Sequence, residues 1–249
     1  MVITLCQQNI AWADPEANRR AAEQQIAAAQ AGSLVVLPET FTPGFGGAMA
    51  EQAEEPEGPT LQWARDAAQR HGKAIVATWI VREGECCYNR LHWLLPDGSG
   101  GHYDKAHLFR GGEAEQLCRG TERPLFTYQG WRIRPAVCYD LRFPTFLRNS
   151  RSLDYDLLLL CANWPQGRRE AWTTLLKARA IENISYVAGC NRTGVDAAGT
   201  EYGGNSLILD YKGQPLATGA PDAPSLCATL DKQALEAFRR RWPFNADFD

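Results

Sequence analysis

The sequence predicts a layered α/β fold in which two β-sheets are sandwiched between helices. Short apolar runs typical of buried strands, such as LVVL at residues 34–37 and LLLLCA at residues 157–162, alternate with helix-like segments. Hairpin patterns, such as the two apolar stretches joined around Gly84, interrupt that alternation. Alternation alone would indicate one doubly wound sheet, so the added hairpins favour two packed sheets. No linker, low-complexity stretch or repeat divides residues 1–249, and we expect a single domain.

Helix signals are clearest in the first third of the chain. Asp14 is a typical N-cap and Pro15 a typical first helical residue, so the alanine-rich segment that follows is expected to be helical up to Gly32. Pro59 opens a second helix that stops at Gly72. Two later helices are expected over RREAWTTLLKARAIENI and KQALEAFRRR.

Strand signals continue along the whole chain. The first is VITL at the N-terminus, and the two longest, KAIVATWIV and CCYNRLHWLL, form the hairpin around Gly84. The remaining expected strands, in chain order, are GHYD, LFTY, IRPAV, YVAGC, SLILD and SLCATL.

Composition excludes several classes of protein. The 45% hydrophobic and 22% charged residues are ordinary for a globular protein, and a net charge of −3 creates no general attraction for nucleic acid or acidic membranes. The basic run at residues 239–241 falls at the end of the last expected helix, where it complements the helix dipole. The N-terminus lacks signal-peptide features, and the apolar run at 157–162 is too short to cross a bilayer. We therefore expect a cytoplasmic protein.

The eight cysteines are scattered without regular spacing and without a C-x-x-C pair. We expect them to be reduced thiols, and we expect no zinc site. Cys86 and Cys87 are adjacent, so on an extended strand they would point to opposite faces.

Reactive and polar groups follow four of the expected strands. They are Glu39, Lys105, Cys138 and Asn163. Ligand crevices of open α/β sheets lie beyond the carboxyl ends of strands, so these four endings are expected to share one pocket. A glutamate can accept the thiol proton, and a lysine can stabilise both a thiolate and an oxyanion. Taken singly, each residue has an ordinary structural explanation, and Cys138 could simply fill the core.

Three segments resemble the signatures of the nitrilase superfamily of carbon–nitrogen hydrolases. They are LVVLPETF, YDKAHLF and AVCYDLRFP, and they occur in the same order as in that family. Further segments, ANWP and ARAIENISYVAGCNR, are similar to its bacterial omega-amidase branch. The resemblance implies a four-layer α-β-β-α sandwich, usually paired into homodimers, that hydrolyses the side-chain amide of 2-oxoglutaramate. It implies no metal and no organic cofactor.

The resemblance also implies roles for particular residues. The catalytic glutamate, lysine and cysteine of the family correspond to Glu39, Lys105 and Cys138. An assisting glutamate corresponds to Glu113, with Glu115 as the alternative. The chain departs from the family pattern at residues 117–118, where an aromatic residue is usual, and at residue 145, where many relatives have glutamate.

Three further residues are expected to contact the substrate. The backbone N–H of Tyr139 would help to hold the oxyanion, and Trp164 belongs to the ANWP segment. The planar fork of Arg142 suits a substrate carboxylate, while a salt bridge to Asp140 is the structural alternative. A small carboxylate-bearing amide of the 2-oxoglutaramate type is the expected substrate. Deaminated glutathione, 2-oxosuccinamate and nitriles are alternatives.

Rival functions have weaker support in the sequence. His107 could pair with Cys138 as in papain-like proteases, but a structural histidine is the preferred interpretation. No G-x-S-x-G segment indicates a serine hydrolase, and GFGG at residues 44–47 does not open a helix after a strand. A non-catalytic binding protein and a thiol-redox protein are the alternatives from other classes.

One apolar stripe and one thiol give expectations about quaternary structure and reactivity. Leu176, Ala180 and Ile184 form an apolar stripe at helical spacing, which would serve either a homodimer interface or the core of one chain. Beside Lys105, Cys138 is expected to have a lowered pKa and to react first with an alkylating agent. Cys118 is expected to be an exposed free thiol with an ordinary pKa.

Overall fold

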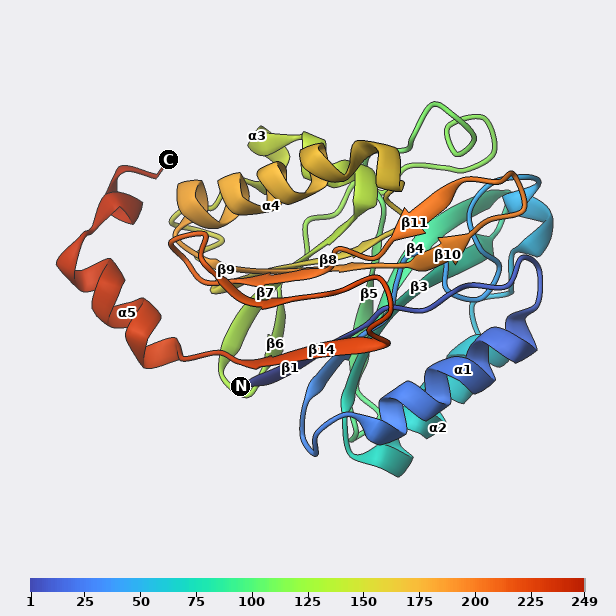
Figure 1. The fold of residues 1–249 in the computed structure, drawn as a ribbon, viewed down its shortest axis with the longest axis horizontal. Helices are drawn as coiled ribbons and strands as arrows, with labels where there is room; N and C mark the ends of the chain where they lie inside the picture. The colour runs from blue at the N-terminus through green and yellow to red at the C-terminus, as the bar shows by residue number, and fades with distance from the viewer. Residues whose placement is uncertain (249) are drawn as a thin grey trace.

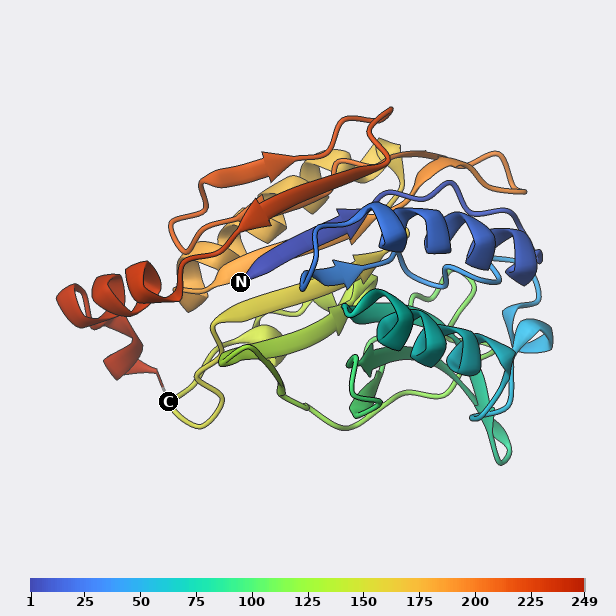
Figure 2. The same cartoon turned by 90° about the horizontal axis from the view of Figure 1, so that it is seen from below.

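The computed structural model describes residues 1–248 and confirms the four-layer α-β-β-α sandwich (Figure 1). Two six-stranded sheets pack against each other. Helices α1 and α2 lie side by side on the outer face of the first sheet (Figure 2), and α4 lies on the outer face of the second. The helices are α1 (Pro15–Ala28), α2 (Pro59–His71), α3 (Pro144–Leu147), α4 (Arg169–Asn183) and α5 (Lys232–Arg241).

The two sheets share one plan, in which three parallel strands are extended by antiparallel ones. Strands β1, β2 and β3 are parallel in the first sheet, and β7, β8 and β9 are parallel in the second. The first sheet runs β14 (Ser225–Thr229), β1 (Val2–Cys6), β2 (Leu34–Val36), β3 (Ala74–Glu83), β4 (Cys86–Leu94), β5 (Gly100–Asp104). The second runs β13 (Pro215–Thr218), β12 (Leu207–Leu209), β9 (Tyr186–Asn191), β8 (Leu157–Ala162), β7 (Trp131–Val137), β6 (Phe126–Tyr128).

A separate short hairpin, β10 (Thr193–Val195) with β11 (Glu201–Gly203), lies at one end of the sandwich (Figures 1 and 2). Four 3₁₀ turns complete the elements: η1 (Met49–Gln52), η2 (Cys138–Arg142), η3 (Gln166–Arg168) and η4 (Phe244–Asp247).

Alternate residues of each central strand serve two different apolar layers. Val36 and Val76 belong to the cluster that the two sheets share, whereas Val35 and Ile75 pack in the cluster beneath α1 and α2. Because successive strand side chains point to opposite faces, a strand covered on both faces must be apolar throughout. This explains the continuous apolar runs of the sequence.

The predicted start of α1 and the predicted end of α2 agree with the structure, whereas the predicted end of α1 does not. The Asp14 carboxylate accepts a hydrogen bond from the Ala17 N–H at 3.0 Å, as an N-cap should. Helix α2 ends at Gly72, whose φ of +60° is a left-handed conformation that glycine adopts without strain. Helix α1 ends at Ala28, one turn before the predicted stop at Gly32.

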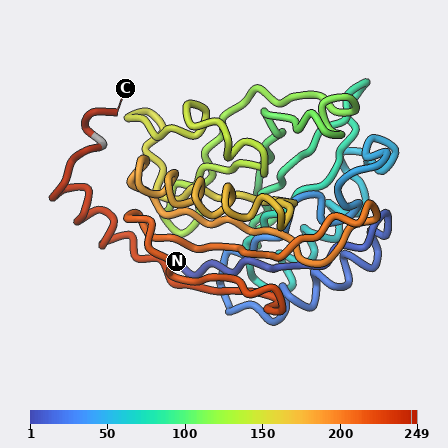
Figure 3. The backbone as a smooth tube through the Cα atoms, turned by 45° about the horizontal axis from the view of Figure 1, so that its top comes forward, coloured from blue at the N-terminus to red at the C-terminus, as the bar shows by residue number. Residues whose placement is uncertain are grey.

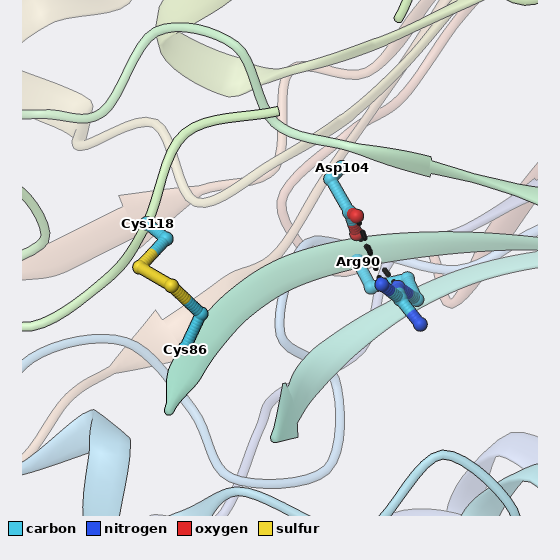
Figure 4. The surroundings of a disulfide bond; sticks show 4 residues. All are labelled: Cys86, Arg90, Asp104 and Cys118. Atoms are coloured by element: carbon cyan, nitrogen blue, oxygen red, sulfur yellow. Dashed lines mark hydrogen bonds and ion pairs between the residues drawn. A yellow bond between two sulfur atoms is a disulfide. The ribbon is translucent and has the colours of Figure 1, made fainter. Parts of the chain in front are cut away.

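The expectation that all cysteines are reduced is wrong for two of them. Cys86 and Cys118 form a disulfide, with their Cα atoms 5.7 Å apart (Figure 4). The Cys118 N–H donates to the Cys87 carbonyl at 2.8 Å, so the loop lies against the start of β4. Neighbouring Cys87 is buried and free, which agrees with the predicted opposite orientation of the adjacent pair. Residues 32 positions apart meet here, and cysteine spacing alone does not predict such a pairing.

The apolar stripe of α4 serves the core of this chain. Leu176, Ala180 and Ile184 are buried in the cluster between α4 and the second sheet, so they give no support to a dimer interface. Helix α5 extends beyond the end of the sheets, and the segment after it folds back (Figure 3). There the Arg151 side chain donates to the Ala246 carbonyl. Within residues 1–248, no helix has both the length and the apolarity needed to cross a membrane.

Candidate active site

Three charged side chains meet in the interior at the ends of the strands. The Lys105 ammonium contacts one carboxylate oxygen of Glu39 at 2.7 Å and one of Glu113 at 2.6 Å, and all three side chains are fully buried. Glu115 is exposed, and its carboxylate accepts a hydrogen bond from the Gly112 N–H at 3.3 Å. Of the two glutamates that the sequence offered as assistants, Glu113 is therefore the one beside Lys105.

Two asparagines hold this charged cluster in place. The Asn89 side-chain amide donates to Glu39 at 2.9 Å and to Glu113 at 2.8 Å, which bridges the two carboxylates. The Asn163 N–H donates to the second oxygen of Glu39 at 2.9 Å. Asn163 was expected at a strand end, whereas Asn89 was not among the predicted site residues. Its signal was an amide side chain in the middle of a long predicted strand, because a buried amide must find hydrogen-bond partners.

The cluster joins the two sheets rather than lying in the crevice of one. Glu39 and Lys105 follow β2 and β5 of the first sheet, whereas Cys138 and Asn163 follow β7 and β8 of the second. The four predicted strand endings do converge, because Lys105 and Asn163 both contact Glu39 and both line one cavity with Cys138. These strand endings meet because two sheets pack face to face, and not because they border the crevice of one open sheet.

Cys138 lies in a strained turn directly after β7. Its φ of +41° is in the left-handed region, which is costly for a residue with a side chain. The buried Asp140 carboxylate braces this turn by accepting from the Val137 N–H at 2.9 Å, the Tyr103 hydroxyl at 2.7 Å and the His107 ring at 2.8 Å. His107 thus supports the turn through Asp140, in agreement with the structural interpretation of that histidine.

Electrostatics correct the prediction of a lowered Cys138 pKa. Burial raises the pKa of this thiol well above its usual range, and the Glu39 carboxylate raises it further, while the Lys105 ammonium lowers it less. Burial also raises the pKa of Glu39, against the opposing effect of Lys105. Before substrate binds, Cys138 is therefore a neutral thiol, and the nearby Glu39 carboxylate binds a proton more tightly than an ordinary glutamate does. The raised pKa removes the reason to expect that Cys138 reacts first with an alkylating agent. Cys118 is in the disulfide and is not the free thiol that the sequence predicted.

Lys105 remains an ammonium in this environment. Burial lowers its pKa, but the Glu113 and Glu39 carboxylates raise it by more, so the pKa lies above its usual value. A buried cation so placed is suited to stabilise an oxyanion. Among the described residues, no group of three or more His, Cys, Asp or Glu side chains could hold a metal ion.

A cavity of about 270 Å³ opens onto this site and is here named the inner chamber. Arg142 lies in its wall with its Cζ atom 4.9 Å from the ring centroid of Trp164. The salt bridge between Arg142 and Asp140 that the sequence left open is not formed, because Asp140 is occupied by the turn and by His107. The inner chamber is lined by Phe45, Lys105, Phe109, Cys138, Tyr139, Arg142, Asn163, Trp164, Pro165 and Arg168.

Comparison with known proteins agrees with this geometry. The carbon-nitrogen hydrolase family matches residues 2–240. Omega-amidase YafV of Yersinia enterocolitica is 44% identical over 99% of this chain and 96% of its own. The 2-oxoglutaramate amidase of Bacillus subtilis is 34% identical over 97% of this chain and 95% of its own.

A solved structure extends the likeness to three dimensions. A CN-hydrolase superfamily protein of Xanthomonas campestris, solved with an arsenic adduct in its active site, superposes with a TM-score of 0.96 at 43% identity, over 100% of this chain and 97% of that one. The chain therefore belongs to the carbon-nitrogen hydrolase family of the nitrilase superfamily, and it is an amidase that acts on carbon–nitrogen bonds.

Proposed function

We propose that this amidase hydrolyses the side-chain amide of a small carboxylate-bearing substrate of the 2-oxoglutaramate type, releasing ammonia through a thioester on Cys138. The observation that carries the proposal is the inner chamber, where a thiol and Lys105 share a wall with the cationic Arg142. A volume of about 270 Å³ suits a short substrate. The names of the relatives in Yersinia enterocolitica and Bacillus subtilis support the same substrate class.

The proposed reaction begins with proton transfer from the Cys138 thiol to Glu39. The sulfur attacks the amide carbonyl, and Lys105 with the Tyr139 N–H stabilises the oxyanion. Glu39 then gives its proton to the departing ammonia as the carbon–nitrogen bond breaks. Water, deprotonated by Glu39 with Glu113 nearby, attacks the thioester and releases the acid and the thiol. The raised pKa of Glu39 favours its role as proton carrier.

Ammonia release and trapping of the acyl-enzyme test this proposal. We expect the highest kcat/KM for 2-oxoglutaramate within a panel that also holds 2-oxosuccinamate, deaminated glutathione, a neutral amide and a nitrile. Acid quenching during turnover, followed by peptide mapping, should show the acyl group on the Cys138 peptide. The peptide that contains the exposed free Cys227 is the control and should stay unmodified. Turnover without an adduct on Cys138 under saturating substrate, or no activity on carboxylate-bearing amides, would contradict the proposal.

We further propose a cytoplasmic homodimer built from single-domain chains. Exposed apolar side chains on the α4 and C-terminal side support the pairing in place of the buried stripe. Ile181 and Leu216 are 58% and 45% exposed, and Trp242 and Phe244 are 46% and 55% exposed. Light scattering at micromolar concentration should give twice the monomer mass, and a monomer alone would contradict the pairing.

A further inference from the structure

Arg168 is a second arginine of the inner chamber, and its backbone is fixed to the chamber wall. It is the last residue of η3, and its carbonyl accepts a hydrogen bond from the Trp164 indole N–H at 2.8 Å. Its own N–H donates to the Pro165 carbonyl at 3.0 Å. The guanidinium lies with Cζ 5.5 Å from the ring centroid of Phe109. Residues 163–165 join β8 to η3, so Arg168 is carried by the same segment that supplies Trp164.

The positive charges of the two arginines in the inner chamber are not neutralised by any acidic residue of its lining. Lys105 is paired with two carboxylates that lie behind it, whereas none of the residues lining the chamber is acidic. Within residues 1–248, the guanidinium groups of Arg142 and Arg168 form no ion pair or hydrogen bond with a protein acceptor, and both side chains are exposed. Two planar cations beside aromatic rings form a ready site for a carboxylate.

We infer that Arg168 is a specificity-determining residue, which binds the substrate carboxylate together with Arg142 while Cys138 attacks the amide at the other end. The inference rests on the proposed function and identifies the groups that recognise its substrate class. Arg142 is fixed by the turn that carries Cys138, and Arg168 is fixed by the turn after β8. A carboxylate held by both would align the amide with the thiol.

A second cavity of about 760 Å³, here named the outer chamber, bears on how long the substrate can be. Arg168 lines both chambers and is the only cationic residue that lines the outer one in the described part of the chain. Glu51 and Asp196 line the outer chamber, and Asp196 accepts from the Tyr202 hydroxyl at 2.9 Å. An anionic tail that passed Arg168 would therefore face two carboxylates. The arrangement favours short acids, such as 2-oxoglutaramate, over amides whose charged tail extends farther, such as deaminated glutathione.

The Arg168→Met variant tests the inference through the ratio of two activities. We expect kcat/KM for 2-oxoglutaramate to fall roughly 10- to 100-fold, mainly through KM, because one charge-assisted hydrogen-bonding partner is removed. Hydrolysis of pentanamide, which has no carboxylate, should change less than about twofold. The dissociation constant of 2-oxoglutarate, the acid product, should rise by a similar factor, which checks binding without turnover. Arg168→Lys should give a smaller loss because it keeps the charge but not the planar fork.

The neighbouring Arg169 provides a matched control. It is also exposed, it begins α4, and it lines neither chamber. Arg169→Met should leave both activities and the 2-oxoglutarate affinity unchanged. In the double variant of Arg142 and Arg168 to Met, the combined loss should be smaller than the product of the single losses, because both groups share one carboxylate.

The failures of the two proposals have different signatures. If Arg168→Met lowers both activities equally, or leaves the 2-oxoglutaramate activity and product affinity unchanged, the inference about Arg168 is wrong. In that case a wild-type preference for acidic amides would still support the proposed function. If the wild-type enzyme hydrolyses no carboxylate-bearing amide, the proposed function itself is wrong.

Discussion

Cys138 and Cys161 are two neighbouring thiols with different surroundings. Cys161 of β8 is paired in register with Val137, the last residue of β7, and Cys138 is the first residue after that strand. Burial raises the pKa of both thiols well above the usual range. Cys161 lies within β8 with no exposed surface, whereas Cys138 lies past the end of β7 and lines the inner chamber. Placement at a strand end, with a base and a cation beside it, distinguishes the candidate nucleophile from the core residue.

Replacing each of the two cysteines by alanine tests that comparison most strongly. Cys138→Ala should lower kcat by a factor on the order of 10⁴ to 10⁶, because the attacking atom is lost. Cys161→Ala should keep kcat within about twofold and cost about 1 kcal/mol of unfolding free energy through a small cavity. Ammonia release and urea unfolding measure the two effects. Comparable activity losses in the two variants would remove the distinction drawn here.

The next largest effect compares two buried lysines. Lys105→Met should lower kcat by about 10² to 10³, the usual cost of one oxyanion donor. Lys73 is also buried, but its ammonium donates to the Ile26 and Ala27 carbonyls at the end of α1, at 2.5 and 3.0 Å. Lys73→Met should therefore lower stability and leave kcat unchanged. Circular dichroism would establish that both variants are folded, and near-normal turnover in folded Lys105→Met would contradict its role.

The sequence predicts which residues reach this site better than it predicts their contacts. Glu39 and Cys138 follow apolar runs and Lys105 follows the short extended segment GHYD, so the positions of all three past strand ends could be predicted from local sequence patterns. That Glu39 and Lys105 meet could be expected, but the bridge by Asn89 depends on the packing of the loop that carries Glu113. Patterning does not describe such contacts between distant segments.

The wrong predictions about the cysteines also arise from contacts between distant segments. The disulfide between Cys86 and Cys118 and the raised pKa of Cys138 both depend on residues far away in the chain. The choice between two partners for Arg142 was open for the same reason. Asp140 is used by Tyr103 and His107, which leaves the guanidinium beside Trp164. Local sequence patterns predict strands and turns, whereas contacts between distant residues determine pKa values, disulfides and ion pairs.

The smallest predicted effect concerns a buried titratable group that lies outside both chambers. The His92 ring stacks on Trp79, with ring centroids 3.8 Å apart and an interplanar angle of 4°. The ring is 5% exposed, and within residues 1–248 its Nε2 atom has no hydrogen-bond partner. Burial lowers the pKa of His92 well below its usual value, and the nearby Arg90 lowers it further. Here a large pKa shift reports packing and no catalytic role, as it does for Cys161.

Acid unfolding should show that shift. In the unfolded chain His92 takes up a proton near pH 6.5, whereas in the folded chain it stays neutral to lower pH. The unfolded state therefore binds more protons as the pH falls below about 6.5, and folding stability decreases by up to about 1.4 kcal/mol per pH unit from this group. His92→Phe keeps an aromatic ring beside Trp79 but cannot titrate. Its unfolding free energy, measured with urea from pH 7.5 to 5.5, should fall less steeply than that of the wild type, while kcat stays the same. Parallel curves for the two proteins would show that His92 is not the group whose protonation is opposed by burial.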